Sequence, residues 1–198
     1  MLRQEIITAP PVQPISLEYA KKAFKLDVEE AVEDDLLAVY ISAAADFASS
    51  YTGIMPVLTT VAHYFTEWSD LFIFYQAAPL LEVVSIEYMA ADATTYTELA
   101  AAKYALDAYA SPPRVKILKP DFLPTVNTDQ PAPIKITFKA GYRADGTNAE
   151  KQEAVPAIYK QAVALMAAHW YLYRADYARK ELPSAAQHLL NTVKVNWF

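Results

Sequence analysis

The side chains that most often do chemistry in proteins are few in this chain, and their spacing does not bring them together. His63, His169 and His188 are its three histidines, and none shares a predicted helix with a second His or a Glu three or four residues away. That spacing places two metal ligands on one helical face. Because the sequence has no cysteine, it also excludes zinc-thiolate sites, disulfides and cysteine nucleophiles.

The motifs for nucleotide binding and for acyl transfer are missing as well. The three glycines, Gly53, Gly141 and Gly146, are too far apart to form a P-loop or the glycine-rich turn of a dinucleotide-binding fold. Serines such as Ser49 and Ser184 lie outside any nucleophile-elbow pattern. The sequence therefore predicts a protein that is not an enzyme and that needs no metal or cofactor.

Composition and charge narrow the class of protein further. The 198 residues are 54% hydrophobic and 20% charged, which is typical of one folded domain. The net charge of −6 is the opposite of the basic surface that grips nucleic-acid phosphates, so we expect no sequence-specific DNA binding. The first residues lack the pattern of a signal peptide, and the longest apolar run, around Ala162 to Tyr173, is too short to span a bilayer. We expect no membrane insertion.

Residues 155–176 are the most informative segment, because they predict one long helix with two unlike faces. Pro156 suits the first helical position, where its missing N–H costs nothing. The stripe expected to be buried comprises Ile158, Ala162, Leu165, Met166, His169 and Tyr173. Within it, His169 is interpreted as a hydrogen-bonded core residue rather than a metal ligand. The flanks carry Tyr159, Trp170, Tyr171 and Tyr177, which are side chains frequent at protein contacts.

Other helices are expected at both ends of the chain. Ser16 is a suitable N-cap for a short helix that ends near Asp27. A second helix is predicted from Val32 to Tyr51, with Gly53 as its C-terminal cap. Its buried stripe is expected to be Leu37, Tyr40, Ile41, Ala44, Ala45, Ala48 and Tyr51. Residues 182–184 begin the last helix.

The middle of the chain changes to the period of β-strands. The predicted strands are Leu58–Glu67, Leu71–Tyr75, Glu82–Met89, Tyr104–Asp107, Arg114–Leu118 and Ile134–Gly141, mostly paired antiparallel. In the last of them, Ile134, Ile136 and Phe138 alternate with polar residues and should face the core. The proline-rich residues 9–14 are expected to be extended and outside any sheet. Residues 143–154 are expected to form a mobile surface loop.

These elements together predict the α+β class. We expect a bundle of about four helices, two N-terminal and two C-terminal, with an antiparallel β-rich insert between them. The whole chain, 1–198, is interpreted as one domain. Its parts are a helical core at 14–54 and 155–193, the insert at 56–142, an extended N-terminal arm at 1–13, and a C-terminal tail at 192–198.

Eight stretches of the sequence carry a resemblance to a known family. They are PISLEYAKKAFKLD (14–27), EDDLLAVYISAAADFASSYTG (33–53), APLLEVVSIEYMAAD (78–92), YALD (104–107), PPRVKIL (112–118), ITFKAGY (136–142), VPAIYKQAVALMAAHWYLYRAD (155–176) and LPSAAQHLLNTVKVNWF (182–198). In order and spacing they resemble the head-tail connector (adaptor) proteins of long-tailed bacteriophages, over nearly the whole chain.

The resemblance implies a structural protein in the neck of a virion. Such a protein forms a closed head-to-tail homo-oligomeric ring of about 12 subunits beneath the portal protein. The ring extends the DNA channel, through which DNA passes without sequence-specific binding. It also offers an attachment platform to the next neck component, a tail-terminator or stopper protein. Assembly would take place in the cytoplasm of the bacterial host.

Two groups of residues are candidates for these contacts. The side chains expected to bind the portal or a neighbouring subunit are Trp170, Tyr171, Tyr173, Arg174, Tyr177, Lys194, Trp197 and Phe198. The acidic side chains expected to line the channel and repel phosphates are Glu29, Glu30, Glu33, Asp34 and Asp35. Each group has an alternative. The acidic residues also suit a solvated helix N-terminus, and residues 192–198 also suit packing onto their own neighbouring helix.

Two other classes of function remain open. A tail-side completion or terminator protein of the neck would share this composition and the habit of forming rings. A small soluble binding module or hydrolase would instead be a monomer with a ligand pocket. The partner that the purified chain binds separates these classes.

Overall fold

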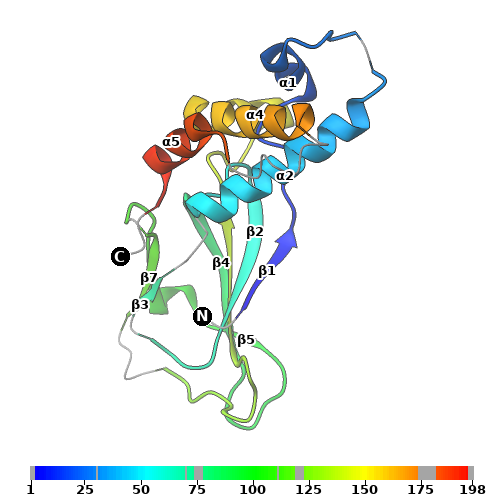
Figure 1. The fold of residues 1–198 in the computed structure, drawn as a ribbon. Helices are drawn as coiled ribbons and strands as arrows, with labels where there is room; N and C mark the ends of the chain where they lie inside the picture. Colours follow the sequence, from blue (N-terminus) through cyan, green and yellow to red (C-terminus); the bar gives the residue numbers. More distant parts are fainter. Residues whose placement is uncertain are drawn as a thin grey trace.

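The computed structural model describes residues 3–29, 31–69, 71–73, 78–110, 112–118, 123–173 and 182–195. Figure 1 shows a layer of helices at one end of a long β-sheet, with a second, smaller sheet beside it. The helices of the described residues are α1 (Leu17–Phe24), α2 (Asp34–Thr52), α3 (Asn148–Glu153), α4 (Ala157–Leu172) and α5 (Ser184–Val193). The predicted α+β class is confirmed, with five helices in place of about four. No helix in this part of the chain has the length and apolar character needed to cross a membrane.

Helix α1 begins as its cap residue predicts but ends early. The Ser16 side chain accepts a hydrogen bond from the backbone N–H of Tyr19 at 3.0 Å, which satisfies one free donor of the first turn. The helix stops at Phe24 rather than near Asp27, because Lys25 adopts a left-handed conformation with φ of 59°.

Helix α2 confirms most of the expected buried stripe. Its buried residues are Leu37, Ile41, Ala44, Ala45, Ala48 and Thr52, while Tyr40 and Tyr51 are half-buried. Gly53, with φ of 75°, ends the helix as predicted and donates its N–H to the Ser49 carbonyl at 2.9 Å. The helix begins at Asp34, so the predicted start at Val32 is two residues too early.

The buried face of α4 is rotated from the face that the spacing predicted. Its buried side chains are Tyr159, Ala162, Val163, Ala164, Met166 and Ala167. Ile158 is 44% exposed and Tyr173 is 37% exposed, so the predicted stripe is wrong at both ends. Tyr159, which we had placed on a flank, is fully buried. Residues 157–172 are apolar on nearly every side, and α1, α2 and α5 all contact the helix, so periodicity alone did not identify its inner face.

The larger sheet is antiparallel throughout and has the strand order β1-β2-β8-β4-β5. Its strands are β1 (Arg3–Thr8), β2 (Thr59–Phe65), β8 (Ile134–Ala140), β4 (Leu80–Tyr88) and β5 (Thr97–Glu98). The smaller sheet contains β3 (Leu71–Ile73), β7 (Arg114–Ile117) and β6 (Tyr104–Asp107), in that order. All six predicted strands are confirmed, although the last two residues predicted for β3 lie outside the described residues.

The two sheets share one hydrophobic core. Ile134, Ile136 and Phe138 of β8 are fully buried, as their alternation predicted. Val115 and Ile117 of β7 join them from the smaller sheet. A separate apolar core lies among the helices, so the molecule has one core in each layer.

Strand β1 was missed by the sequence analysis, which left its residues in an extended arm. It pairs antiparallel with β2 and forms one edge of the larger sheet. Ile6 is 57% exposed and Ile7 is 48% exposed, so neither side chain shows the alternation that marks a half-buried strand. The proline-rich residues 9–14 follow it without helix or strand, as expected.

Helix α3 corrects the prediction of a loop over residues 143–154. The Thr147 hydroxyl accepts from the Glu150 N–H at 3.3 Å, and the Glu150 carboxylate accepts from the Thr147 N–H at 2.7 Å. This reciprocal pair is a capping box. The backbone hydrogen bond from Thr147 lowers the pKa of the Glu150 carboxyl. The spacing of Thr and Glu was visible in the sequence, but Asp145-Gly146 before it favoured a turn.

Gly141 lies where β8 meets the helical layer. Its φ of +142° is in the region that side chains disfavour. A Cβ atom there would lie 2.8 Å from the Leu58 backbone nitrogen and Cα. Glycine is therefore required for the two segments to approach this closely.

Candidate functional site

Two of the aromatic side chains predicted to form an interface, Trp170 and Tyr171, lie at the C-terminal end of α4, against α1 and α2. The Tyr171 ring stacks on Phe24 with centroids 6.4 Å apart and meets Tyr40 edge-on at 6.3 Å. The Trp170 ring lies edge-on to Phe47 at 6.2 Å. Both Trp170 and Tyr171 are half-buried inside the chain. A good part of their surface is therefore used to hold α4 in place.

The last residues of α4 are more open than its aromatic cluster. Leu172 is 62% exposed and Tyr173 is 37% exposed. The His169 ring lies 5.0 Å from the Tyr173 ring, between centroids. His169 is only partly buried, and its Nε2 has no hydrogen-bond partner among the described residues, so the expected hydrogen-bonded core histidine is wrong for this nitrogen.

The predicted acidic cluster divides into paired and open carboxylates. Glu33 accepts a hydrogen bond from the Tyr171 hydroxyl. Asp34 forms an ion pair with the Lys21 ammonium at 2.6 Å. Glu29 and Asp35 are exposed, and Glu30 lies outside the described residues. The two groups of candidate residues, separate in the sequence analysis, therefore meet at the contact of Tyr171 with Glu33.

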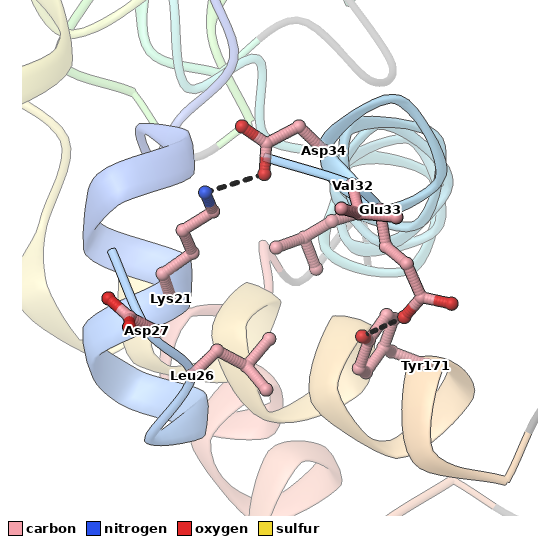
Figure 2. Close-up of a pocket in the computed structure, with 8 residues that line it drawn as sticks. Lys21, Leu26, Asp27, Val32, Glu33, Asp34 and Tyr171 are labelled. Atoms are coloured by element: carbon pink, nitrogen blue, oxygen red, sulfur yellow. Dashed lines mark hydrogen bonds and ion pairs between the residues drawn. The ribbon is translucent and has the colours of Figure 1, made fainter. Parts of the chain in front are cut away.

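These contacts surround a pocket of about 360 Å³ between α1, the start of α2 and the end of α4. Its lining residues are Lys21, Leu26, Asp27, Val32, Glu33, Asp34, Leu37 and Tyr171. Figure 2 shows the Lys21 side chain reaching from α1 to Asp34, and Tyr171 reaching Glu33 from the other side. We call this set of contacts the helical joint. Its charges tie three helices together, which is the arrangement of a structural contact.

Lys21 is the functional residue that sequence reasoning missed. It is only 4% exposed, although lysine is rarely buried without a partner. Besides Asp34, its ammonium donates to the Val28 carbonyl at 3.2 Å. Leu17, Ala20, Lys21 and Phe24 have the spacing of one helical face, which is the signal that identifies this lysine as inward-facing.

Replacing Lys21 with methionine is expected to lower the free energy of unfolding by about 1–3 kcal/mol, because it leaves the Asp34 carboxylate without its buried partner. Methionine keeps the apolar stem, so lost packing contributes little. Urea unfolding of both proteins measures the difference. The matched control is Lys22→Met, since Lys22 is next in sequence but its ion pair with Glu18 is exposed. Equal losses in the two variants would contradict the role of the joint.

The remaining candidates lie near the C-terminus. The Lys194 ammonium lies 4.5 Å from the centre of the Tyr51 ring. The Tyr51 hydroxyl donates to Asn191 at 2.6 Å, and the Val195 N–H donates to the Thr52 carbonyl at 2.9 Å. The segment after α5 thus packs along the end of α2 as far as Val195. Arg174, Tyr177, Trp197 and Phe198 lie outside the described residues.

Within the described ranges, no three His, Asp or Glu side chains converge as a metal site would require. What the site provides is half-buried aromatic rings, an acidic rim and exposed apolar side chains. Side chains of these types are common at protein–protein interfaces.

Neither a protein-family model nor a curated protein matches the sequence. Solved structures match over nearly the whole chain. A chain in the neck of an empty gene transfer agent (GTA) particle, computed with C6 symmetry, is 24% identical with a TM-score of 0.79, covering 99% of this chain and 97% of that one. This chain has the fold of that protein.

Two further structures agree. A chain in the neck of a native GTA particle, computed with C12 symmetry, is 24% identical, with a TM-score of 0.73 over 99% of this chain and 97% of that chain. A chain in the virion of a native GTA particle is 23% identical, with a TM-score of 0.79 over 98% and 96%. The likeness therefore includes the helical layer and both sheets together.

Proposed function

We propose that this protein is a structural subunit of the neck of a phage-like particle, where its copies form a ring. The observation that carries the proposal is the fold shared end to end with a chain of the GTA neck, at a TM-score of 0.79. A structural role without catalysis also agrees with the lack of nucleotide, thiol and nucleophile motifs in the sequence.

In finer terms, the proposed role is that of the head-tail connector, or adaptor. The ring would lie beneath the portal protein, continue the DNA channel and carry the next neck component, a stopper or tail-terminator protein. Two neck structures with this fold were computed with C6 and C12 symmetry, which supports a ring of 12 copies. A closed ring of identical subunits needs only one type of head-to-tail contact.

The helical joint has a defined part in this role. It holds the end of α4, with Trp170 and Tyr171, at a fixed position against α1 and α2. The exposed Leu172 and Tyr173 then extend from a rigid base toward a partner. Among the acidic candidates, Glu29 is exposed and lies outside α2, and it is the one proposed to face the channel, where negative charge discourages DNA from adhering. Glu33 and Asp34 serve the joint instead.

The test is to mix the purified protein with portal rings of its own particle and to image the product by electron microscopy. The expected result is an added collar with the symmetry of the portal. Tail tubes mixed with the same protein serve as the comparison. A collar on tail tubes and none on portals would assign the chain to the tail side as a completion or terminator protein. No collar on either would overturn the proposal.

A matched pair of variants tests whether collar formation depends on the C-terminal end of α4. Leu172→Asp places a charge on the exposed end and is expected to reduce collar formation at least about tenfold, the loss for a contact worth about 1.4 kcal/mol. Val84→Asp changes an equally apolar exposed residue on β4, 46% exposed, and serves as the control. Equal assembly of both variants would remove α4 from the contact.

A further inference from the structure

A ring built from identical copies needs two different surfaces on each subunit that fit one another. The surfaces must lie on opposite sides of the molecule, so that each copy offers one to the neighbour before it and the other to the neighbour after it. The described residues contain two exposed surfaces with this relation. One is acidic and apolar, and the other is basic and apolar.

The first surface is the outer face of α2. Leu36 is 37% exposed and Val39 is 62% exposed. Their spacing of three residues places them on one face of the helix, away from the buried stripe that contains Leu37 and Ile41. The charged residues of α2 are Asp34, Asp35 and Asp46, with no basic residue in the helix. Among the described residues Asp35 makes no ion pair, so its carboxylate is available to a partner.

The second surface is the outer face of the smaller sheet. Strand β7 alternates, with Val115 and Ile117 buried and Arg114 and Lys116 exposed. The outward-facing Lys116 lies opposite Ala105 of β6, which is also exposed. Leu118, which follows β7 in the chain, is 39% exposed. Lys116 forms no ion pair with any described residue, whereas its neighbour Arg114 pairs with Asp107 at 3.0 Å. The surface is therefore apolar with an unused positive charge.

We propose that the outer face of α2 in one subunit packs against the outer face of the smaller sheet in the next copy of this chain. The inference rests on the proposed ring. Figure 1 shows the first turns of α2 at the right of the molecule and the smaller sheet at the left, so the two faces are placed for a head-to-tail contact. Leu36 and Val39 bury their apolar surface against Ala105 and Leu118.

Charge selects the register of this contact. Asp35 of one copy faces Lys116 of the next, so the acidic helix meets the basic sheet. Two α2 faces would instead bring like charges together, because all the charged residues of that helix are acidic. The contact is consequently heterologous, and a heterologous contact whose rotation closes produces a ring rather than an isolated dimer.

Cysteine cross-linking tests the contact directly, because the sequence contains no cysteine. The double variant Val39→Cys with Lys116→Cys is assembled on portal rings, oxidised and run on a non-reducing gel. The expected result is a ladder of covalent oligomers that ends at the size of the ring. Each single variant, treated alike, should remain monomeric. Dimers of the Val39→Cys variant alone would show an isologous contact and overturn the proposal.

Charge exchange gives an independent readout. Asp35→Lys and Lys116→Glu are each expected to reduce collar formation on portals about tenfold, and the double variant should restore it to within about twofold of the unmodified chain. Lys25→Glu makes the same change of charge at the exposed residue that ends α1. It is the matched control and should assemble normally.

The outcomes separate the two proposals. Normal collars with no cross-link, and single charge variants that assemble like the control, would overturn this contact while the neck assignment stands. Failure of the unmodified chain to form any collar would overturn both.

Discussion

Replacing Tyr159 with alanine is expected to lower the free energy of unfolding by about 3–5 kcal/mol, the usual cost of removing a large buried aromatic side chain. Tyr159 is fully buried where α4 crosses α2. Its hydroxyl lies 3.0 Å from the Ser49 hydroxyl and 3.4 Å from the Ala45 carbonyl. Its position also explains why burial raises the pKa of this phenol. Removing the ring leaves a cavity beside Ala45 and Ser49.

Two controls assign the loss to the ring rather than to the hydroxyl. Tyr159→Phe keeps the ring and is expected to cost about 1 kcal/mol, the typical net contribution of one hydrogen bond. Tyr109→Ala removes a completely exposed ring, at 102% exposure, and should leave the stability unchanged. Urea unfolding measures all three. If Tyr159→Ala were as stable as the unmodified chain but failed to form collars, Tyr159 would be the interface residue that its spacing indicated.

The fold was predictable wherever a local signal had one physical meaning. Ser16 and Gly53 marked helix ends because a side-chain cap and a left-handed residue are local requirements. The alternation in residues 134–140 marked a strand with one buried face. In α4 the signal was ambiguous, since alanine and other apolar residues occur on nearly every side. Which side is buried was decided by the approach of α2 and α5, and no local pattern contains that information.

The candidate site shows the same limit at longer range. The sequence analysis assigned Tyr171 and Glu33 to two separate groups of candidate residues. They are 138 positions apart in the chain, and their hydrogen bond depends on how α2 and α4 cross. Lys21 could have been found, because it shares a helical face with Ala20 and because acidic residues open the next helix. Strand β1 could not have been predicted, because its side chains are exposed on both faces. Only its backbone pairing with β2 makes it a strand.

The second large effect is a loss of stability at low pH. His63 lies in β2 with no exposed surface, and its ring centroid is 4.8 Å from that of Phe138 and 6.4 Å from that of Phe65. Burial lowers the pKa of His63 from 6.5 to about 3. The folded protein therefore keeps this histidine neutral, while the unfolded chain takes up a proton below pH 6.5. Stability is fully present above that pH and is lost as the pH falls toward 3.

The size of this loss follows from the shift. Protonation of His63 in the unfolded chain is expected to lower the free energy of unfolding by about 2 kcal/mol between pH 7.5 and pH 5. Between pH 7.5 and pH 3.5 the decrease is about 4 kcal/mol. His63→Phe removes the titrating group and keeps an aromatic ring among its neighbours. The difference in unfolding free energy between the variant and the unmodified chain should therefore change by these amounts across the range, whatever its value at pH 7.5.

Urea unfolding at a series of pH values makes the comparison, with His188→Gln as the control at an exposed histidine. The carboxylates titrate in all three proteins, so they cancel in the difference. Parallel curves for His63→Phe and the unmodified chain would mean that His63 is protonated equally in the folded and unfolded states. In that case the sheet core would have to admit a charge beside Phe138, which a side chain with no exposed surface does not allow.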